Sequence, residues 1–402
     1  MSRFIKLSVV CAMMLPLFVI ADENLKEAST LSGMFEKGRV SGEVRSMYVG
    51  YELKKAGEND IYATAIGGHL KYESAQLNAF SVAAAFALSH DIGFATGDGG
   101  VKQNPELSSS DGEHSLLREA YLNYNGGDFN FRAGRQMIDT PLADSDDIRM
   151  IANTFEAYVA SYQLSNFSFM AGKLQKWQGY DADLDSGWVR TGEDGTWFGG
   201  VTYADDIAQA NAWYYNITKL TNAVYFDLTL GYEIESDISL SAGVQYLNER
   251  EISSSATKAD IYGALAEFSA YGFTFGAAYN NSRKQAESGS FSGFGGGTLF
   301  TSMDTMILDE ITYDRDAEAL VGTISYEIDK LKLSYAYGNF KGEADSFGDR
   351  AHIVEQNIGA EYIIIEDKLL FRAIYVEQED RESLAKTDND WNRLEFMVAY
   401  SF

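Results

Sequence analysis

From residue 38 onward, the sequence alternates apolar with small or polar residues in segments of about ten, separated by turn-forming residues. This period of two predicts β-strands with two different faces. The last segment is the clearest, because Leu394, Phe396 and Val398 share one face while Arg393 and Glu395 share the other. We predict eighteen strands, at about 38–52, 61–72, 77–93, 116–125, 129–136, 154–164, 167–177, 195–203, 208–218, 224–232, 239–248, 258–270, 273–281, 319–326, 332–339, 353–363, 368–376 and 392–402.

The connections between these strands fall into two sets that largely alternate along the chain. The short ones are 126–127, 165–166, 271–272 and 327–330, and the longer ones are 94–115, 137–153, 178–194, 282–318 and 340–352. Short periplasmic turns and longer outer loops are typical of outer-membrane barrels, and an even strand number puts both termini on the periplasmic side. We therefore predict an all-β fold, a closed transmembrane antiparallel β-barrel of about 18 strands over residues 38–402. A β-sandwich or a solenoid fits less well, since no fixed repeat is present.

The first 21 residues predict a secretory signal peptide. Arg3 and Lys6 precede an uncharged apolar run over 7–20, and Ala21 ends a small-residue cleavage site. The run is shorter than the roughly 20 residues of a spanning helix. Residues 22–37 would then form a short periplasmic or lumenal segment before the first strand.

Composition excludes several classes of protein. Acidic residues outnumber basic ones 59 to 32, a formal charge of −27, and loss of the two basic residues of the signal peptide would change −27 to −29. Such a balance argues against nucleic-acid binding, which needs clustered Lys and Arg. The four histidines are scattered, and the Gly295–Gly297 run lacks the Lys-Ser/Thr of a phosphate loop. We therefore expect neither an enzyme nor a metal or cofactor site; a membrane-embedded hydrolase stays an alternative without a nucleophile motif.

The segment 134–158 is the strongest candidate for a functional site. It links the fifth and sixth predicted strands, holds Pro141, and combines acids with nearby arginines. A solvated surface loop is one interpretation. The sharper one is a third outer loop folded into the lumen, where opposed charges narrow the aqueous path. The candidate constriction residues are Arg132, Arg135, Asp139, Asp144, Asp146, Asp147 and Arg149.

This segment resembles the constriction-loop region of OprD-family porins. The matching elements are Gly134-Arg135-Gln136, Thr140-Pro141, Asp146-Asp147-Ile148-Arg149 and Thr154-Phe155. The chain departs from the family at Ala152, where a proline is usual shortly after the arginine. The resemblance implies an eighteen-stranded barrel, related to the major outer-membrane porins of that strand number, with an inward-folded third loop.

The resemblance also implies a ladder of basic residues on the inner wall. Besides Arg132, the candidates at or near polar-face positions are Arg45, Lys173, Lys332 and Arg393. Lys173 is ambiguous, because its register matches Phe167 and Phe169 unless a bulge intervenes. For each candidate, a position at the pore mouth or the membrane interface is the alternative.

The long connection 282–318 is a second candidate for a loop that lies in the lumen. Its acids Asp304, Asp309 and Glu310 would face the third loop. A structural Ca²⁺ held by these carboxylates is an alternative, since hard cations take several oxygen ligands, although no EF-hand spacing is present.

These observations predict an outer-membrane porin of a Gram-negative bacterium. It would be a passive or facilitated diffusion channel for small hydrophilic solutes and ions, with selectivity set by a charged constriction. The alternative is a surface-displayed structural or adhesion barrel without significant transport. The expected partners are solutes, ions, outer-membrane lipid and the barrel-assembly machinery, which would recognise the C-terminal Phe402. The acidity predicts a modest cation preference, and the sequence leaves the solute and the choice of monomer or homotrimer open.

Overall fold

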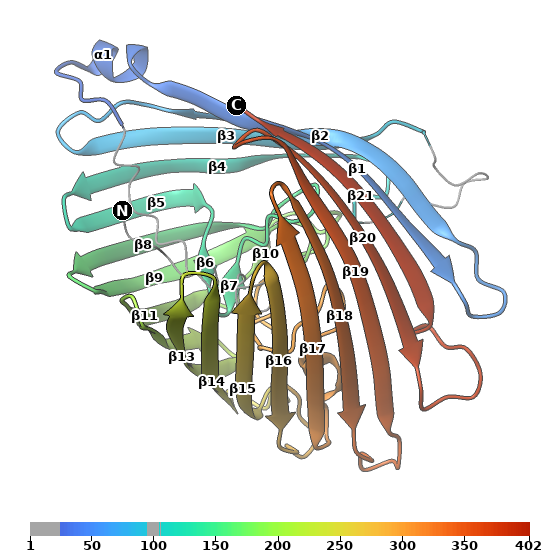
Figure 1. Ribbon diagram of the computed structural model, residues 1–402. Coiled ribbons are helices and arrows are strands. Elements are labelled where there is room, and N and C mark those ends of the chain that lie inside the picture. Colours follow the sequence, from blue (N-terminus) through green and yellow to red (C-terminus); the bar gives the residue numbers. More distant parts are fainter. Residues whose placement is uncertain (1–24, 95–103, 105) are drawn as a thin grey trace.

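A computed structural model describes residues 25–94, 104 and 106–402 (Figure 1). The predicted signal peptide, 1–21, lies outside these residues. The predicted closed, antiparallel, eighteen-stranded barrel is confirmed. All eighteen strands lie where the period-two pattern places them, with ends that differ by a few residues.

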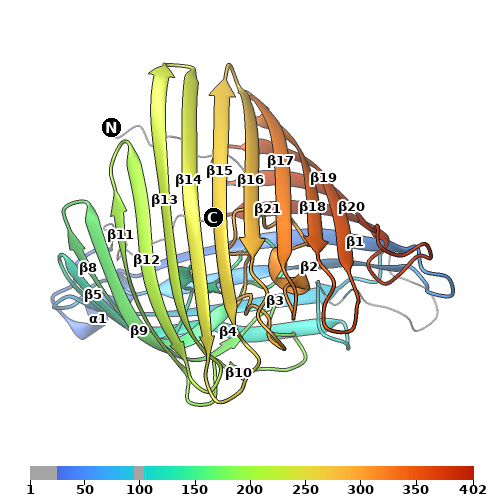
Figure 2. The same cartoon turned by 90° about the horizontal axis from the view of Figure 1, so that it is seen from below.

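The barrel strands follow one another in chain order around the wall, as Figure 2 shows for β8 to β20. They are β1 (Arg39–Leu53), β2 (Ile61–Glu73), β3 (Phe80–Asp91), β4 (Glu113–Gly126), β5 (Phe129–Gln136), β8 (Thr154–Leu164), β9 (Phe167–Gln178), β11 (Thr196–Ala204), β12 (Ala208–Ile217), β13 (Thr221–Glu235), β14 (Ile238–Glu251), β15 (Ala259–Ala270), β16 (Phe273–Ser282), β17 (Ala317–Ile328), β18 (Leu331–Gly342), β19 (Ala351–Ile365), β20 (Leu369–Asp380) and β21 (Trp391–Ser401).

Five short elements were not expected from the sequence. They are the helix α1 (Leu31–Glu36), the two-residue strands β6 (Asp139–Thr140), β7 (Ala143–Asp144) and β10 (Val189–Arg190), and the 3-10 turn η2 (Leu308–Ile311). None has enough residues to show a hydrophobic period, so pattern alone could not find them. In the described part of the chain, no helix is long and apolar enough to cross a membrane.

Pairing of the last strand with the first closes the barrel. β21 lies between β20 and β1 in Figure 1, and the Glu43–Ser401 to Leu53–Trp391 register runs along both strands. At the end of this seam, Gly42 and Phe402 exchange backbone N–H···O bonds of 3.0 Å. Closure removes the unpaired strand edges that lipid could not satisfy.

The two faces of each strand have opposite chemistry. On β21, Phe396, Val398 and Tyr400 each expose 41% of their surface, whereas Arg393 and Glu395 are fully buried inside. This alternation puts the apolar face toward lipid and the polar face toward the lumen, as expected for such a barrel.

The two ends of the barrel also differ. Residues 127–128, 165–166, 205–207, 236–237, 271–272, 329–330 and 366–368 form the short turns of one end. The N-terminal segment lies at this end, where Ala28 N–H donates to the Gln76 carbonyl (2.7 Å) between β2 and β3. The opposite end carries the long connections, including 137–153, 179–195 and 283–316. By the usual orientation of such barrels, the short turns are periplasmic and the long connections are outer loops.

Candidate functional site

The connection 137–153, between β5 and β8, is anchored first on the inner face of β12. Its β6–β7 hairpin turns at Pro141 and Leu142, and Leu142 N–H donates to the Tyr215 hydroxyl (3.3 Å). Leu142 and Tyr215 are both fully buried in one apolar cluster with Phe155 and Leu299. Burial of these side chains stabilises this end of the connection against the wall.

The second half of the same connection contacts a different part of the wall. Met150 and Ile151 are buried against Met47 of β1 and Met397 of β21. Arg149 lies beside them, with a guanidinium nitrogen 3.1 Å from Glu395 of β21. The connection therefore has one anchor on β12 and another on β1 and β21.

The long connection 283–316 packs against this crossing segment. Asp144 N–H donates to the Phe294 carbonyl, and Phe294 N–H donates to the Leu142 carbonyl, both at 3.0 Å. The Thr298 hydroxyl donates to the Pro141 carbonyl, and the Phe294 ring lies 5.5 Å from that of Trp177. The two connections thus form one packed body.

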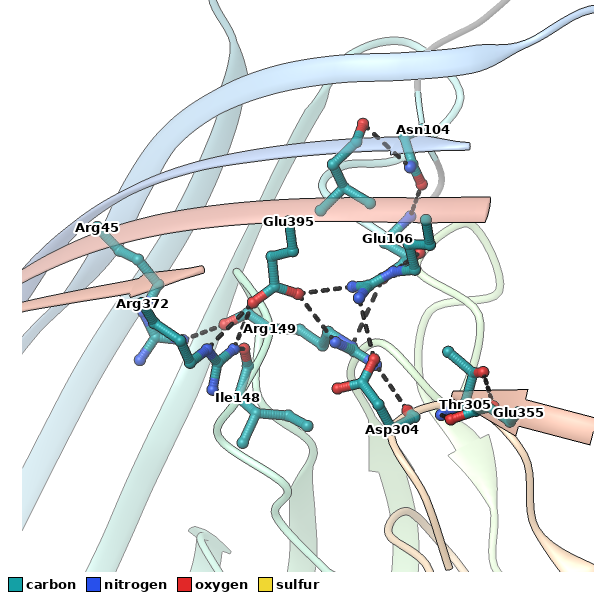
Figure 3. Close-up of polar contacts among 12 residues, drawn as sticks. Arg45, Asn104, Glu106, Ile148, Arg149, Asp304, Thr305, Glu355, Arg372 and Glu395 are labelled. Atoms are coloured by element: carbon teal, nitrogen blue, oxygen red, sulfur yellow. Dashed lines mark hydrogen bonds and ion pairs between the residues drawn. The ribbon is translucent and has the colours of Figure 1, made fainter. Parts of the chain in front are cut away.

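Arginines and carboxylates form an extended network where this body meets the wall (Figure 3). Arg393 contacts Glu106 (2.7 Å), Asp304 (3.0 Å) and Glu395 (2.6 Å). Arg149 reaches the same three carboxylates, at 3.6, 3.8 and 3.1 Å, and Arg372 binds Glu395 at 2.6 Å.

The network continues along the inner wall toward β4. Arg45 pairs with Glu43 (2.6 Å) and Asp147 (3.3 Å), and Arg118 pairs with Asp147 (2.8 Å). Backbone carbonyls of connection 137–153 link these ion pairs to those around Glu395. Arg45 donates to the Arg149 carbonyl, and Arg372 donates to the Ile148 carbonyl (2.7 Å). Within the described residues, five arginines meet five carboxylates, so the formal charge of this arginine network is zero: Arg45, Arg118, Arg149, Arg372 and Arg393 with Glu43, Glu106, Asp147, Asp304 and Glu395.

The arginines keep the loop carboxylates of this network ionised. Partial desolvation opposes the charge of Asp147, but Arg118 and Arg45 outweigh it and hold the Asp147 pKa below its usual value. Burial likewise opposes ionisation of Asp304, yet Arg149 and Arg393 lower its pKa. Opposite charges within a few ångströms favour the charged form of both partners.

A cavity of 860 Å³ lies beside the arginine network, and its lining holds more carboxylates than cations. Its only lining cation among the described residues is Arg149, and its aromatic lining comes from Tyr51, Trp177 and Tyr180. Its carboxylates are Asp139, Asp144, Asp146, Asp147, Asp181, Asp304 and Glu310. Of these, only Asp147 and Asp304 belong to the arginine network; we call the other five, Asp139, Asp144, Asp146, Asp181 and Glu310, the unpaired acids.

Two unpaired acids titrate close to neutral pH. The enclosed surroundings, and then the neighbouring Asp139 and Asp146, raise the pKa of Asp144 to about 7. Enclosure and the nearby Asp181 raise the pKa of Asp146 to about 7, against the opposing effect of Arg149. Like charges and desolvation both disfavour the ionised form.

The structure places most predicted constriction residues in these two groups, with exceptions. Asp147 and Arg149 lie in the arginine network, and Asp139, Asp144 and Asp146 line the cavity. Arg132 faces inward from β5, where its guanidinium donates to Asn123 (3.3 Å) and lies 4.1 Å from the Tyr121 ring centre.

The prediction that Arg135 lines the constriction is wrong. Arg135 shares the outer face of β5 with Phe129 and Phe131, because residues two apart on a strand point the same way. It pairs there with Glu156 (3.2 Å) and lies over the Trp188 ring at 4.4 Å. The place of Arg135 in the loop motif does not determine which face of the strand it occupies.

The ladder candidates divide in the same way. Arg45 and Arg393 face inward and are buried in the network. Lys332 shares the inner face of β18 with Ser334 and Ala336, near the periplasmic turn. The prediction that Lys173 lines the pore is wrong. Lys173 shares the outer face of β9 with Phe169 and lies 5.1 Å from the Trp197 ring. The bulge in β9 lies beyond Lys173, between Leu174 and Lys176, and so does not turn it inward.

The predicted acids of the second long connection lie in three different places. Asp304 joins the arginine network and Glu310 lines the cavity, but Asp309 is buried at η2, away from the cavity lining. Among the described residues, no three His, Cys, Asp or Glu side chains are arranged to hold a metal ion. The suggested Ca²⁺ therefore has no support from side-chain geometry.

Sequence reasoning missed several members of the site. Glu395 and Arg372 could have been found, because each sits on the inner face of a well-patterned strand. Arg118 was obscured by the bulge that shifts the register of β4. Glu106 and Asp181 lie in irregular connections, where no period indicates direction.

Comparison with known proteins places this geometry in a family. The profile of the OprD family of outer membrane porins matches residues 33–401. A search of curated protein sequences gave no match. Among solved structures, Acinetobacter baumannii OccAB4 is similar with a TM-score of 0.77 at 14% identity, over 91% of this chain and 98% of that one. Pseudomonas aeruginosa OccK9 (OpdG) gives 0.78 at 14% identity, over 92% and 99%.

Another similar structure is Pseudomonas aeruginosa OpdK with vanillate, with a TM-score of 0.76 at 15% identity, over 92% of this chain and 100% of that one. These likenesses concern the fold, whereas the family profile covers nearly the whole barrel. This chain therefore belongs to the OprD family of outer membrane porins, which are channels of the Gram-negative outer membrane.

Proposed function

We propose that this porin passes small hydrophilic solutes by passive or facilitated diffusion through a path narrowed by connections 137–153 and 283–316. The support is the anchoring of the first connection on β12 at Leu142 and on β21 at Arg149. The second connection packs on the first through Phe294. A loop held at both ends leaves a restricted passage beside it, and pore width and lining charge then determine selectivity.

We propose further that the narrowed path prefers cations. The observation that carries this proposal is the contrast between the neutral arginine network and the five unpaired acids of the 860 Å³ cavity. Arg45, Arg149 and Arg393 are already bound to carboxylates of the chain, so an anionic solute would have to displace them. Ionised acids without a basic partner raise the local concentration of cations.

This proposal predicts a solute class different from vanillate, the molecule present in the OpdK structure. Vanillate carries a carboxylate, which free arginines would bind well. In this chain, the cavity offers carboxylates and the rings of Tyr51, Trp177 and Tyr180. Such a lining favours solutes with ammonium or guanidinium groups, which bind both carboxylates and aromatic faces.

The test is the reversal potential of the purified porin in a planar bilayer under a KCl gradient. The sign expected is that of a K⁺-preferring channel, and a Cl⁻-preferring channel would overturn the proposed selectivity. Absence of conductance would instead favour a surface-displayed structural or adhesion barrel.

Two loop variants test the narrowed path separately. Asp146→Ala removes an unpaired acid, and Arg149→Ala removes the loop cation that binds Glu395. We expect the first to lower cation preference and the second to change single-channel conductance. If both variants keep the conductance and selectivity of the native porin, the connection 137–153 does not bound the path.

The remaining partners are also proposals. We propose that the barrel-assembly machinery recognises the C-terminal strand, whose Tyr400 and Phe402 rings stack 6.4 Å apart on the outer face. The homotrimer stays an alternative to the monomer, and cross-linking in native membranes would distinguish them.

A further inference from the structure

A cluster of cations lies on the outer face of the barrel wall, near the outer-loop end of β5, β9 and β10. It consists of Arg135, Lys173, Lys176 and Arg190, which we call the outer basic cluster. Strand register brings its members together. Glu156 of β8 is paired in register with Arg135 on one side and Lys176 on the other, and Lys176 is paired with Arg190.

Three of the four cations of this cluster form no ion pair in the described part of the chain. Glu156 is the one carboxylate in an ion pair with the cluster among the described residues, and it binds Arg135 at 3.2 Å. The structure records no carboxylate partner within that part of the chain for Lys173, Lys176 or Arg190. In a chain with a formal charge of −27, this patch of cations on the outer wall differs from the arginine network inside, where cations and carboxylates are equal in number.

Large aromatic side chains flank these cations. Trp197 of β11, 58% exposed, is paired in register with Lys173, and Tyr158 of β8, 53% exposed, is paired with it on the other side. Trp188 lies under the Arg135 guanidinium at 4.4 Å. Aromatic girdles of this kind mark the lipid–water interface of outer-membrane barrels.

The strand sequence sets the height of the cluster. Along β9, Phe167, Phe169 and Ala171 occupy the outer face before Lys173, with the periplasmic turn at the Phe167 end. The outer face of β9 is therefore apolar from the periplasmic turn to Ala171 and basic from Lys173, beside Trp197, toward the outer loops. A lysine is costly at the bilayer midplane but close to neutral in cost at the interface, where headgroup anions can reach it.

We propose that the outer basic cluster binds the phosphate groups of the anionic glycolipid of the outer leaflet. The cations would contact phosphate, while Trp197 and Tyr158 would rest at the boundary between the sugar headgroup and the acyl chains. Arginine and lysine both bind phosphate oxygens through charge-assisted hydrogen bonds. The proposal concerns the outer wall and is independent of solute selectivity in the lumen.

The test uses the purified full-length porin in neutral detergent with EDTA. Native mass spectrometry would measure binding of a bis-phosphorylated glucosamine-disaccharide lipid and of the same lipid after enzymatic removal of both phosphates. The test variant is Lys173→Gln with Lys176→Gln, neither of which forms a recorded ion pair. The matched control is Arg250→Gln with Lys341→Gln, which removes the same charge from the outer faces of β14 and β18.

We expect the phosphorylated lipid to bind the native porin and the control variant alike, and the test variant about fivefold more weakly for each lysine removed. The dephosphorylated lipid should bind all three proteins weakly. Equal binding of the two lipids, or an equal loss in the control variant, would overturn the proposal.

Channel recordings in a neutral-lipid bilayer keep this test separate from the proposed function. The test variant should retain the native reversal potential, because Lys173 and Lys176 point away from the lumen. A changed reversal potential would place these lysines at the pore and count against a lipid site.

Discussion

Two regions of the same connection show what charge does inside this barrel. Asp147 and Arg149 belong to the arginine network, where every guanidinium meets at least one carboxylate. Asp144 and Asp146, one to five residues earlier, line the cavity without an ion-pair partner in the described structure. Matched charges bind the connection to the wall, and under the proposed function the unmatched charges would set the field that a solute meets. The two groups therefore differ in their ion-pair partners and not in the kind of charge they carry.

The largest expected effect is a loss of stability when Glu395, in the arginine network, is replaced. This carboxylate is fully buried and binds Arg149, Arg372 and Arg393. Glu395→Gln keeps the shape, but it removes the carboxylate of Arg372 and leaves the arginine network with one more cation than anions, which should cost about 3–5 kcal/mol of unfolding free energy. Urea unfolding of the porin in detergent measures the loss.

The matched control is Glu361→Gln, which removes an inward carboxylate near the periplasmic end of β19 that has no ion pair in the described structure. It should change stability by less than about 1 kcal/mol. If both variants unfold at the same urea concentration, the arginine network does not hold the connection in place.

A glycine where the two connections touch offers a smaller, steric perturbation. Gly295 has φ +85°, and an added Cβ would lie 2.3 Å from the Asn153 amide nitrogen and 2.4 Å from the Asp144 carbonyl. Gly295→Ala should therefore cost about 1–3 kcal/mol through overpacking and displace 283–316 from 137–153. The readouts are urea unfolding and single-channel conductance.

Gly348→Ala is a close control, because Gly348 has a similar φ of +91° with no atom within 4 Å of an added Cβ. It shares the backbone strain, about 1 kcal/mol, without the steric clash. Conductance that changes equally in both variants would mean that backbone strain, and not contact between the connections, controls the path.

Removing charge from the unmatched side should act on selectivity more than on stability. Each ionised acid at roughly 7 Å from a passing cation contributes about 0.6 kcal/mol in water, or roughly a threefold change in local cation concentration. Asp144→Asn combined with Asp181→Asn should thus lower the K⁺/Cl⁻ permeability ratio several-fold. Reversal potentials measure the ratio.

Asp205→Asn is the control for this pair, since Asp205 lies in the periplasmic turn between β11 and β12, outside the cavity. It should leave the permeability ratio unchanged. A drop of the same size there would assign selectivity to overall charge and remove the role of the cavity.

The sequence predicted the wall better than it predicted the site, for a physical reason. A strand repeats every two residues, so Arg45 and Arg393 could be assigned to the inner face from their neighbours alone. The same rule places Arg135 on the outer face of β5, whereas its position in the loop motif suggested the constriction. Glu106 and Asp181 are positioned by contacts between connections far apart in the chain, such as the ion pair of Glu106 with Arg393, and no local pattern encodes these.

The smallest expected effect is a dependence of selectivity on pH. The pKa of Asp144 and of Asp146 is about 7, so both are mostly ionised at pH 8 and mostly protonated at pH 6. Asp147 and Asp304 stay ionised over this range, because their arginines lower their pKa. Acidification therefore removes negative charge from Asp144 and Asp146 and not from Asp147 or Asp304, and the K⁺/Cl⁻ permeability ratio should fall about two- to fivefold between pH 8 and pH 6. Asp144→Asn with Asp146→Asn should start at the lower ratio and flatten the pH profile. A native profile that is flat between these values would show that the unpaired acids do not titrate where solutes pass, and the two regions would then differ in pairing but not in function.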